Sequence, residues 1–285
     1  MIFPSSIKKV LVTGATGFLA HGLIEKLLSM DIQVSAVARN EGKLIALKNT
    51  FPLITINPCP IEDFHLLKKA CLDCDGIFHL ASFKDVILSG EHPLKTVQTN
   101  ILGTLNILKL SVENENIKFI VNTSTDKATK VSSVYGATKL IVESLFLEYE
   151  KINPFCSYRI VRYGNVFYST GSVLVKWKNA LLNNKEIILT EPSATRYFWS
   201  REEAIECLFE CLYKSNDATP LIPKMRSISV GDLLEIMIKK YSPFDRPAIK
   251  VIGLQNGENL HEELTNQESS LTAERWDENE LLLII

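Results

Sequence analysis

Residues 9–20 read Lys-Val-Leu-Val-Thr-Gly-Ala-Thr-Gly-Phe-Leu-Ala, a short apolar run followed by a glycine-rich turn. The apolar part predicts a buried strand over residues 9–12, and the next pattern predicts a helix over residues 18–28. Glycines in the turn let the backbone approach a pyrophosphate, which then lies at the helix N-terminus. The stretch therefore predicts the first βα unit of a dinucleotide-binding domain. The predicted cofactor contacts of this turn are Gly14, Thr16, Gly17, Phe18 and Leu19.

Short apolar runs alternate with amphipathic stretches through the first half of the chain. Such alternation is typical of βαβ units and of a parallel sheet. Further strands are predicted over residues 33–38, 76–80, 118–122 and 157–161. Helices are predicted between them over residues 41–48, 61–72, 96–112 and 135–151. We therefore predict an α/β fold, a Rossmann-type doubly wound parallel sheet, with the dinucleotide-binding domain over residues 1–165.

The alternation weakens after about residue 165. Helices are predicted over residues 173–182, 201–214 and 230–240, with short strands near 186–189 and 250–252. We interpret residues 166–285 as a smaller substrate-binding lobe, some segments of which return to the Rossmann domain. The run Leu281–Ile285 is predicted to form a last strand or a contact between subunits.

Composition and charge exclude several classes of protein. The 285 residues carry a net charge of −2, without the basic surface that nucleic-acid binding needs. No apolar run approaches the roughly 18 residues that span a bilayer, and the first residues lack the plan of a signal peptide. We therefore expect a cytoplasmic protein that binds neither nucleic acid nor membrane.

The six cysteines include the pair Cys71-x-x-Cys74, a spacing that can indicate a redox or zinc site. No second Cys or His pair accompanies it, and the residues before it read as helix. We favour the interpretation that these cysteines are small apolar residues near a helix end. No metal site is predicted.

The end of the second strand bears on the choice of cofactor. An NAD site places an acid there for the ribose hydroxyls, whereas this chain has Arg39 followed by Asn40. The guanidinium fork suits a 2′-phosphate, so NADP is the predicted cofactor. The alternative is that Arg39 is only a solvated loop residue. Ile61 is predicted to lie beside the adenine ring.

Residues 124–139 read Ser-Thr-Asp-Lys-Ala-Thr-Lys-Val-Ser-Ser-Val-Tyr-Gly-Ala-Thr-Lys and carry two chemical devices. Tyr135 and Lys139 are four residues apart, so a helix places both on one face, where the ammonium can lower the pKa of the phenol. Thr125, Asp126 and Lys127 follow a predicted strand, at the edge where ligands bind in open α/β sheets. A tyrosine base beside an acid and an amine favours oxidation, elimination and reduction over simple dehydrogenation.

Together these segments resemble the extended short-chain dehydrogenases/reductases, and within them the UDP-N-acetylglucosamine 4,6-dehydratases of polysaccharide biosynthesis. The resemblance covers nearly the whole chain. It also rests on the segments at residues 161–166, 171–173, 195–198, 223–224 and 257–263. With a tyrosine at position 135, the chain resembles the inverting branch of these dehydratases, whose members also epimerise C5 of the sugar.

The resemblance implies a three-stage reaction on a nucleotide-sugar, with a UDP-N-acetylhexosamine as the expected substrate. Tyr135 takes the C4 hydroxyl proton as hydride leaves C4, and Thr125 hydrogen-bonds that oxygen. Neutral Lys127 then removes the C5 proton while protonated Asp126 donates to the departing C6 hydroxyl. Hydride returns to C6, so the predicted NADP is regenerated.

The resemblance also assigns binding residues and implies a homo-oligomer. At the cofactor it adds Arg39, Ile61, Ala81, Ser82, Lys84, Asn100, Tyr135, Lys139 and Tyr163. At the substrate it implies Lys84, Asn165, Ser172, Val173, Thr195, Arg196 and Glu258. His79 and His261 are predicted to be structural residues.

The differences from that family gather where the nucleotide-sugar is expected. Thr170 and Gln255 stand where arginines are usual, and arginines there would clamp a diphosphate. Arg196, Lys224 and Arg226 are the candidates to compensate. The altered clamp leaves open a different nucleotide-sugar, a stalled elimination or slow turnover.

Two alternatives to the dehydratase stay open on the sequence. The first is a nucleotide-sugar epimerase without water loss, whose chemistry at C4 needs neither Asp126 nor Lys127. The second is a non-catalytic NADP-binding scaffold protein. Only the altered clamp favours the scaffold, and the presence of Tyr135 and Lys139 opposes it.

Overall fold

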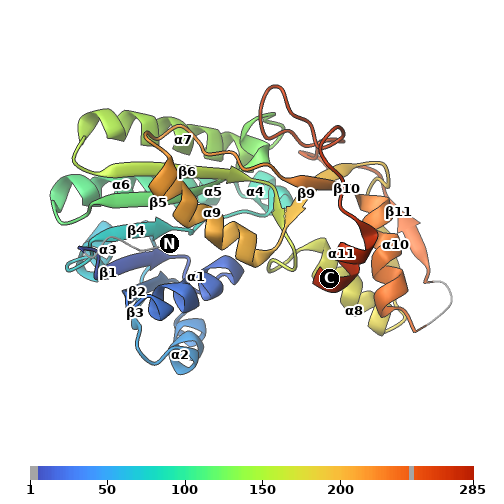
Figure 1. The fold of residues 1–285 in the computed structure, drawn as a ribbon, viewed down its shortest axis with the longest axis horizontal. Coiled ribbons are helices and arrows are strands. Elements are labelled where there is room, and N and C mark those ends of the chain that lie inside the picture. The colour runs from blue at the N-terminus through green and yellow to red at the C-terminus, as the bar shows by residue number, and fades with distance from the viewer. Residues whose placement is uncertain (1–5, 244–246) are drawn as a thin grey trace.

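A six-stranded parallel sheet forms the larger part of the molecule, a computed structural model that describes residues 6–243 and 247–285 (Figure 1). Its strand order is β3-β2-β1-β4-β5-β6. The strands are β1 (Lys9–Thr13), β2 (Gln33–Ala38), β3 (Thr55–Pro58), β4 (Gly76–His79), β5 (Phe119–Thr125) and β6 (Ser157–Tyr163). The order reverses at β1 and β4, so the switch point at which such sheets bind ligands lies at the carboxyl ends of these two strands.

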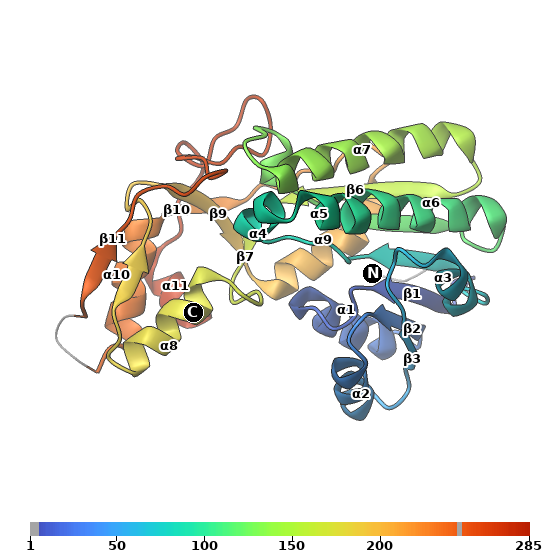
Figure 2. The same cartoon turned by 180° about the vertical axis from the view of Figure 1, so that it is seen from behind.

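Helices cover both faces of the sheet, as Figures 1 and 2 show. On one face Val10 and Val12 pack with α1 (Phe18–Ser29), α2 (Glu41–Thr50) and α9 (Arg201–Lys214). On the other face Leu11 packs with α3 (Phe64–Ala70), α6 (Gly103–Glu113) and α7 (Val134–Ile152). Neighbouring residues of one strand thus enter two different cores, which explains its continuous apolar run. The predicted Rossmann-type fold is confirmed.

Two helices differ from their predicted lengths. The helix predicted over residues 96–112 is divided into α5 (Pro93–Val97), a π-helical turn η1 (Gln98–Leu102) and α6. Helix α3 begins only at Phe64, because Asp63 accepts a hydrogen bond from Leu66 N (3.0 Å) and caps it. The short helix α4 (Val86–Glu91) and strand β3 were not predicted. Each is too short to give a clear periodic signal.

A smaller lobe follows the sheet and lies to its right in Figure 1. It contains a three-stranded sheet in the order β10-β9-β7 and a two-stranded sheet of β11 and β8. These strands are β7 (Asn165–Val166), β8 (Ile187–Leu189), β9 (Thr195–Trp199), β10 (Arg226–Ser229) and β11 (Ile249–Val251). The helices α8 (Val173–Leu182), α10 (Val230–Tyr241) and α11 (Glu278–Ile284) share a core with them.

The strand predicted as one alternative for Leu281–Ile285 is wrong, because residues 281–284 belong to α11 and Ile285 is its C-cap, and the alternative of a contact between subunits stays a prediction. Asp277 caps this helix by accepting hydrogen bonds from the backbone N–H groups of Asn279 and Glu280. Leu281 is buried in the core of the smaller lobe, whereas Leu283 is exposed. The cap and the one-sided burial outweigh the strand preference of the apolar run.

Helix α9 returns the chain from the smaller lobe to the Rossmann sheet. It follows β9 and begins with a capping box formed by Ser200 and Glu203. It packs on α1, where a Cβ at Gly22 would lie 2.6 Å from Ile205 Cδ1. Among the described residues, no helix is long and apolar enough to cross a membrane.

Candidate active site

The turn between β1 and α1 lies directly against the end of β4. Gly14 has a φ of +65°, and a Cβ on it would lie 2.8 Å from the backbone nitrogen of Ala81. Gly17 donates its backbone N–H to Gly14 O (2.8 Å) and precedes the first residue of α1. The turn therefore needs a glycine at position 14. It leaves bare backbone at a helix N-terminus, as a dinucleotide pyrophosphate requires.

A continuous chain of hydrogen bonds supports this edge of the sheet. Ala81 N–H donates to Thr13 Oγ1 (3.2 Å), and Thr13 Oγ1 lies 2.7 Å from His79 Nδ1. On the far side of the ring, His79 Nε2 lies 2.9 Å from Thr104 Oγ1, which donates to Asn100 O (2.6 Å). The direction of these bonds places the imidazole proton on Nε2. Burial lowers the pKa of His79 to about 3, as does the charge of Lys139, so the ring is neutral.

The side-chain amide of Asn100, in the π-helical turn η1, hydrogen-bonds with other groups of the protein through both its oxygen and its nitrogen. Its Oδ1 accepts from Ser82 Oγ (3.1 Å) and Phe83 N (2.7 Å). Its Nδ2 donates to Phe83 O and to Thr138 Oγ1, both at 3.0 Å. Asn100 therefore fixes the loop after β4 against α7. A direct contact of its amide with the cofactor stays a prediction, and the geometry favours a positioning role.

Arg39 is an exposed cation at the predicted adenosine end of the cofactor site. It directly follows β2, while Asn40 caps α2 by accepting a hydrogen bond from Lys43 N (2.8 Å). Ile61 is buried against Gly103, where a Cβ would lie 2.6 Å from Ile61 Cδ1. Lys84 is exposed after β4. These positions are compatible with the predicted contacts.

Helix α7 carries Tyr135 and Lys139, as predicted. Ser133 caps the helix, and a Cβ at Gly136 would lie 2.3 Å from Lys127 O. This close approach sets the first turn of α7 on the catalytic candidates at the end of β5. Lys139 Nζ donates to Thr123 O (2.7 Å). Burial lowers the pKa of Lys139 to about 8, against the opposing charge of Glu143.

The pKa of Tyr135 depends on burial and on three neighbouring side chains. Burial raises the pKa of Tyr135 to about 12; the charge of Lys127 and a hydrogen bond with Thr125 act to lower it, and Asp126 acts to raise it. The cation that lowers the pKa of this phenol in the substrate-free structure is Lys127. The effect of Lys139 on the phenol, predicted from the four-residue spacing, stays a prediction. The Lys139 ammonium is instead directed to Thr123 O.

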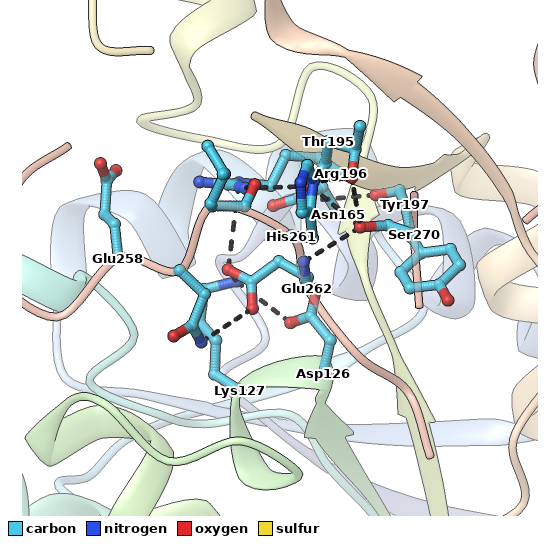
Figure 3. A network of polar contacts seen from close by, with 12 residues as sticks. Asp126, Lys127, Asn165, Thr195, Arg196, Tyr197, Glu258, His261, Glu262 and Ser270 are labelled. Atoms are coloured by element: carbon cyan, nitrogen blue, oxygen red, sulfur yellow. Dashed lines mark hydrogen bonds and ion pairs between the residues drawn. The ribbon is translucent and has the colours of Figure 1, made fainter. Parts of the chain in front are cut away.

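Asp126 and Lys127 belong to a chain of four charged side chains that joins the two lobes (Figure 3). Both residues lie in the short 3-10 helix η2 (Asp126–Ala128) after β5. Asp126 Oδ1 accepts from Thr125 Oγ1 (2.8 Å) and from Lys127 Nζ (3.1 Å). Lys127 Nζ lies 3.4 Å from Glu262 Oε1, which lies 3.9 Å from Arg196 Nε. We call these four residues the charged quartet.

The quartet bears on the predicted role of Lys127, which needs its amine to be neutral when it removes the C5 proton. Burial alone would lower the pKa of Lys127, but the charges of Asp126 and Glu262 raise it above its ordinary value. The two ion pairs therefore favour the ammonium form of Lys127. Sequence reasoning gave Glu262 no role, although it lies in the segment 257–263 that carried part of the resemblance. The only available signal was an acid in that segment, and nothing indicated that it meets Lys127.

The substrate residues predicted in the smaller lobe are divided among three places: the surroundings of the charged quartet, the segment beside Gln255, and the start of α8. Asn165 donates to Tyr197 O (3.1 Å), and Thr195 Oγ1 lies between His261 Nδ1 (2.9 Å) and Ser270 Oγ (2.7 Å). Asn165 and Thr195 lie near the charged quartet, to which Arg196 itself belongs, whereas Glu258 stands apart from it (Figure 3). Glu258 accepts a hydrogen bond from Gln255 N (3.0 Å). Ser172 precedes α8, and Val173 is its first residue.

The cations expected to replace the altered clamp are engaged elsewhere. Arg226 NH1 lies 2.6 Å from Glu280 Oε2, and its guanidinium lies 3.4 Å from the centre of the Trp276 ring. Lys224 Nζ lies 3.6 Å from Glu274 Oε2. Gln255 lines a cleft of about 510 Å³ between α4, the start of α7 and residues 254–257. Arg226 is thus held by a carboxylate and an aromatic ring, whereas Lys224 is exposed, and compensation for the altered clamp by Arg196, Lys224 or Arg226 stays a prediction.

No cluster of three or more His, Cys, Asp or Glu side chains that could hold a metal occurs among residues 6–243 and 247–285. All six cysteines are free and buried.

Tyr163, a predicted cofactor contact, is buried beside Trp199, with ring centres 5.1 Å apart.

Comparisons with known proteins agree with this architecture. The sequence profile of a family described as "Polysaccharide biosynthesis protein" matches residues 10–282. A protein of Methanocaldococcus jannaschii described as an uncharacterized membrane protein is 33% identical over 95% of this chain and 84% of its own. The "UDP-N-acetylglucosamine 4,6-dehydratase (inverting)" of Campylobacter jejuni is 30% identical over 94% of this chain and 80% of its own.

An epimerase and a solved structure are also similar. The "UDP-glucose 4-epimerase" of Rickettsia bellii is 29% identical over 94% of this chain and 80% of its own. The X-ray structure of Pen from Bacillus thuringiensis is 30% identical, with a TM-score of 0.87 over 90% of this chain and 81% of that one.

Proposed function

The chain belongs to the polysaccharide biosynthesis protein family, among the nucleotide-sugar dehydratases and epimerases of the extended short-chain dehydrogenase/reductase type, and we propose that it is an NADP-dependent nucleotide-sugar 4,6-dehydratase. The proposed substrate is UDP-N-acetylglucosamine. The observation that carries this proposal is the hydrogen-bonded pair of Asp126 and Lys127 beside Tyr135. Oxidation at C4 followed by epimerisation requires Tyr135 but neither member of the pair.

The first step is removal of the C4 hydroxyl proton by Tyr135. The nicotinamide supplies, when bound, the hydride acceptor and later the hydride donor for this chemistry. Burial opposes ionisation of the phenol, whereas the Lys127 charge and the Thr125 hydrogen bond favour it. Thr125 therefore helps to hold both the Tyr135 phenol and the Asp126 carboxylate in position through hydrogen bonds.

Elimination of water requires an acid and a base at the same time. Transfer of one proton along the 3.1 Å hydrogen bond from Lys127 Nζ to Asp126 Oδ1 produces both, a neutral amine and a neutral carboxylic acid. The amine takes the C5 proton, and the acid donates a proton to the departing C6 hydroxyl. The ammonium later returns a proton to C5. Over the cycle Asp126 returns to the carboxylate, Tyr135 has gained the C4 hydroxyl proton and Lys127 has lost one, so passage of that proton from Tyr135 back to Lys127 resets the site.

NADP is proposed on the position of Arg39. An exposed guanidinium directly after β2 can form a bidentate, charge-assisted contact with a 2′-phosphate. Arg39→Ala is expected to weaken NADPH binding by about tenfold or more and to leave NADH binding unchanged. Fluorescence titration of both cofactors tests this, with NADH as the internal control. Equal binding of NADPH and NADH by the unaltered protein would contradict the proposal.

The reaction is tested by incubating UDP-N-acetylglucosamine with the protein and NADP in heavy water. Loss of one water in the mass spectrum, with deuterium at C5 in the proton NMR spectrum, is the expected result, and the coupling constants report the C5 configuration. A C4 epimer of unchanged mass would support an epimerase instead. An untouched substrate with NADP bound would favour another sugar or a scaffold protein.

The isosteric variant Asp126→Asn is the matched control. It keeps the size of the side chain but cannot supply the proton for the departing hydroxyl. We expect it to retain oxidation at C4, seen as absorbance of the reduced cofactor, and to lose dehydration. Unchanged dehydration in this variant would remove Asp126 from the mechanism.

A further inference from the structure

Glu262 reaches the candidate active site from a segment far away in the sequence. It is 2% exposed, and its Oε1 lies 3.4 Å from Lys127 Nζ. Lys127 is therefore bracketed by two carboxylates, one from its own loop and one from the smaller lobe (Figure 3). A buried carboxylate is costly unless it is paired, so the position of Glu262 beside this ammonium has a strong electrostatic basis.

The backbone of Glu262 is fixed on both sides by one residue. Glu262 N donates to Ser270 Oγ (3.0 Å), and Ser270 N donates to Glu262 O (2.8 Å). Ser270 is fully buried and donates its hydroxyl to Thr195 O (3.1 Å). Asn259 Nδ2 approaches the second carboxylate oxygen, Oε2, at 3.5 Å. The carboxylate is thus held at a defined place by β9 and the segment around it.

Four titratable or charged side chains act on Lys127 from the elements packed around it. Asp126 in η2 and Glu262 stabilise its ammonium, and Arg196 in β9 opposes them. Tyr135 in α7 interacts with the same charge. Removing one of the two carboxylates leaves the ammonium with one anion and one opposing cation, so its preference for the charged form must fall.

We propose that Glu262 is a positioning residue that holds Lys127 as an ammonium and so controls how readily Lys127 passes its proton to Asp126. The proposal extends the proposed dehydratase mechanism and rests on it for its catalytic consequence. The effect on the proton of Lys127 itself requires no substrate. It follows from the 3.4 Å ion pair and its burial.

The proton state of Lys127 can be measured on the whole protein without substrate. Competitive acetylation with acetic anhydride over a series of pH values, read by mass spectrometry of the peptide that contains Lys127, reports the neutral amine at this residue. Glu262→Gln is expected to move the midpoint of Lys127 labelling to lower pH by about one unit or more. Glu262→Asp retains the charge and is expected to restore most of the difference.

The matched control is the neighbouring acid, Glu263, which pairs with the exposed Lys130 at 3.4 Å. Glu263→Gln is expected to leave the labelling midpoint of Lys127 unchanged. Circular dichroism of each variant checks that the fold is retained. A midpoint in Glu262→Gln equal to that of the unaltered protein, or an equal shift in Glu263→Gln, would overturn the proposal.

A catalytic measurement separates this inference from the proposed function. If the unaltered protein dehydrates the sugar, the pH profile of deuterium incorporation at C5 is expected to move to lower pH in Glu262→Gln. A merely structural role would lower the rate at every pH without moving the profile, which would count against the proposal. If the unaltered protein does not dehydrate the sugar, the proposed function fails, and the labelling midpoints still decide the role of Glu262.

Discussion

Tyr135 lies in an environment that opposes the ionisation it needs. Burial raises its pKa to about 12, and the nearby Lys127 charge only partly offsets this. A phenol in such a place is useful as a base only while the charges around it keep their positions. The charged quartet keeps the Lys127 charge in position, because two carboxylates form ion pairs with it.

Tyr135→Phe removes the phenol and leaves the ring. We expect turnover of the nucleotide-sugar to fall by about 10²–10⁴-fold, the usual contribution of a positioned general base. Cofactor affinity, measured by NADPH fluorescence, is expected to change little. A variant that still reduces the cofactor at the original rate would show that another group takes the C4 hydroxyl proton.

Lys139 predicts a pH dependence of stability whose sign can be worked out. Its pKa is about 8 in the folded chain, against an ordinary value of 10.5, so the unfolded chain holds more protons between these pH values. Its contribution to stability therefore rises as the pH increases through this interval, by a total on the order of 3 kcal/mol. Lys139→Met is expected to remove this rise. Urea unfolding of both proteins across the interval measures it, and parallel curves would contradict it.

At the scale of elements, the contact between α7 and η2 brings the catalytic candidates together. The first turn of α7 packs on the backbone of Lys127, and only the missing side chain at Gly136 permits this approach. The π-helical turn η1 also connects elements of the site, because its residue Asn100 hydrogen-bonds both the loop after β4 and helix α7. Such single π turns often occur at functional sites.

Gly136→Ala introduces a Cβ 2.3 Å from Lys127 O. We expect a loss of at least about 2 kcal/mol of stability and a larger loss of activity, because Tyr135 and Lys127 must separate. Gly90→Ala is the control, since a Cβ there meets nothing within 4 Å. Its stability is expected to stay within about 1 kcal/mol of the original. Urea unfolding compares the two, and similar stability would mean that η2 moves without cost.

At the scale of the whole molecule, a buried ion pair connects three distant segments. Arg162 in β6 contacts Glu143 of α7 through two bonds of 3.0 and 2.5 Å. It also donates to Leu264 O (3.0 Å) in the segment that follows Glu262. The pair therefore ties the smaller lobe's C-terminal segment to the sheet edge that carries the quartet.

Arg162→Met leaves the Glu143 carboxylate buried without its cation. We expect a loss of about 3–5 kcal/mol, measured by urea unfolding. The control Lys214→Met breaks an exposed pair with Glu210 and is expected to cost about 0.5 kcal/mol or less. Comparable losses in the two variants would show that the buried pair contributes no more than an exposed one.

The sequence predicted the Rossmann half well because its signals are local. Buried strands such as β2, the glycine turn and the Tyr135–Lys139 spacing are each contained in a few consecutive residues. In the smaller lobe, β7, β9 and β10 are short and pair with strands distant in the chain, so no local pattern specifies them. The role of Glu262 was missed for the same reason, because it depends on an ion pair with Lys127, which lies more than a hundred residues away in the sequence.

The hydrogen-bond chain through His79 has a consequence for how the molecule can adapt. Ala81 N–H only donates and Asn100 O only accepts, and every group between them donates on one side and accepts on the other, so only one arrangement of protons satisfies all of them. A shift of the loop beside the glycine turn without the π-helical turn would therefore break at least one of these hydrogen bonds. This half of the site thus has a fixed polarity, and under the proposed function we expect the opposite wall, not this one, to adapt to differently shaped sugars.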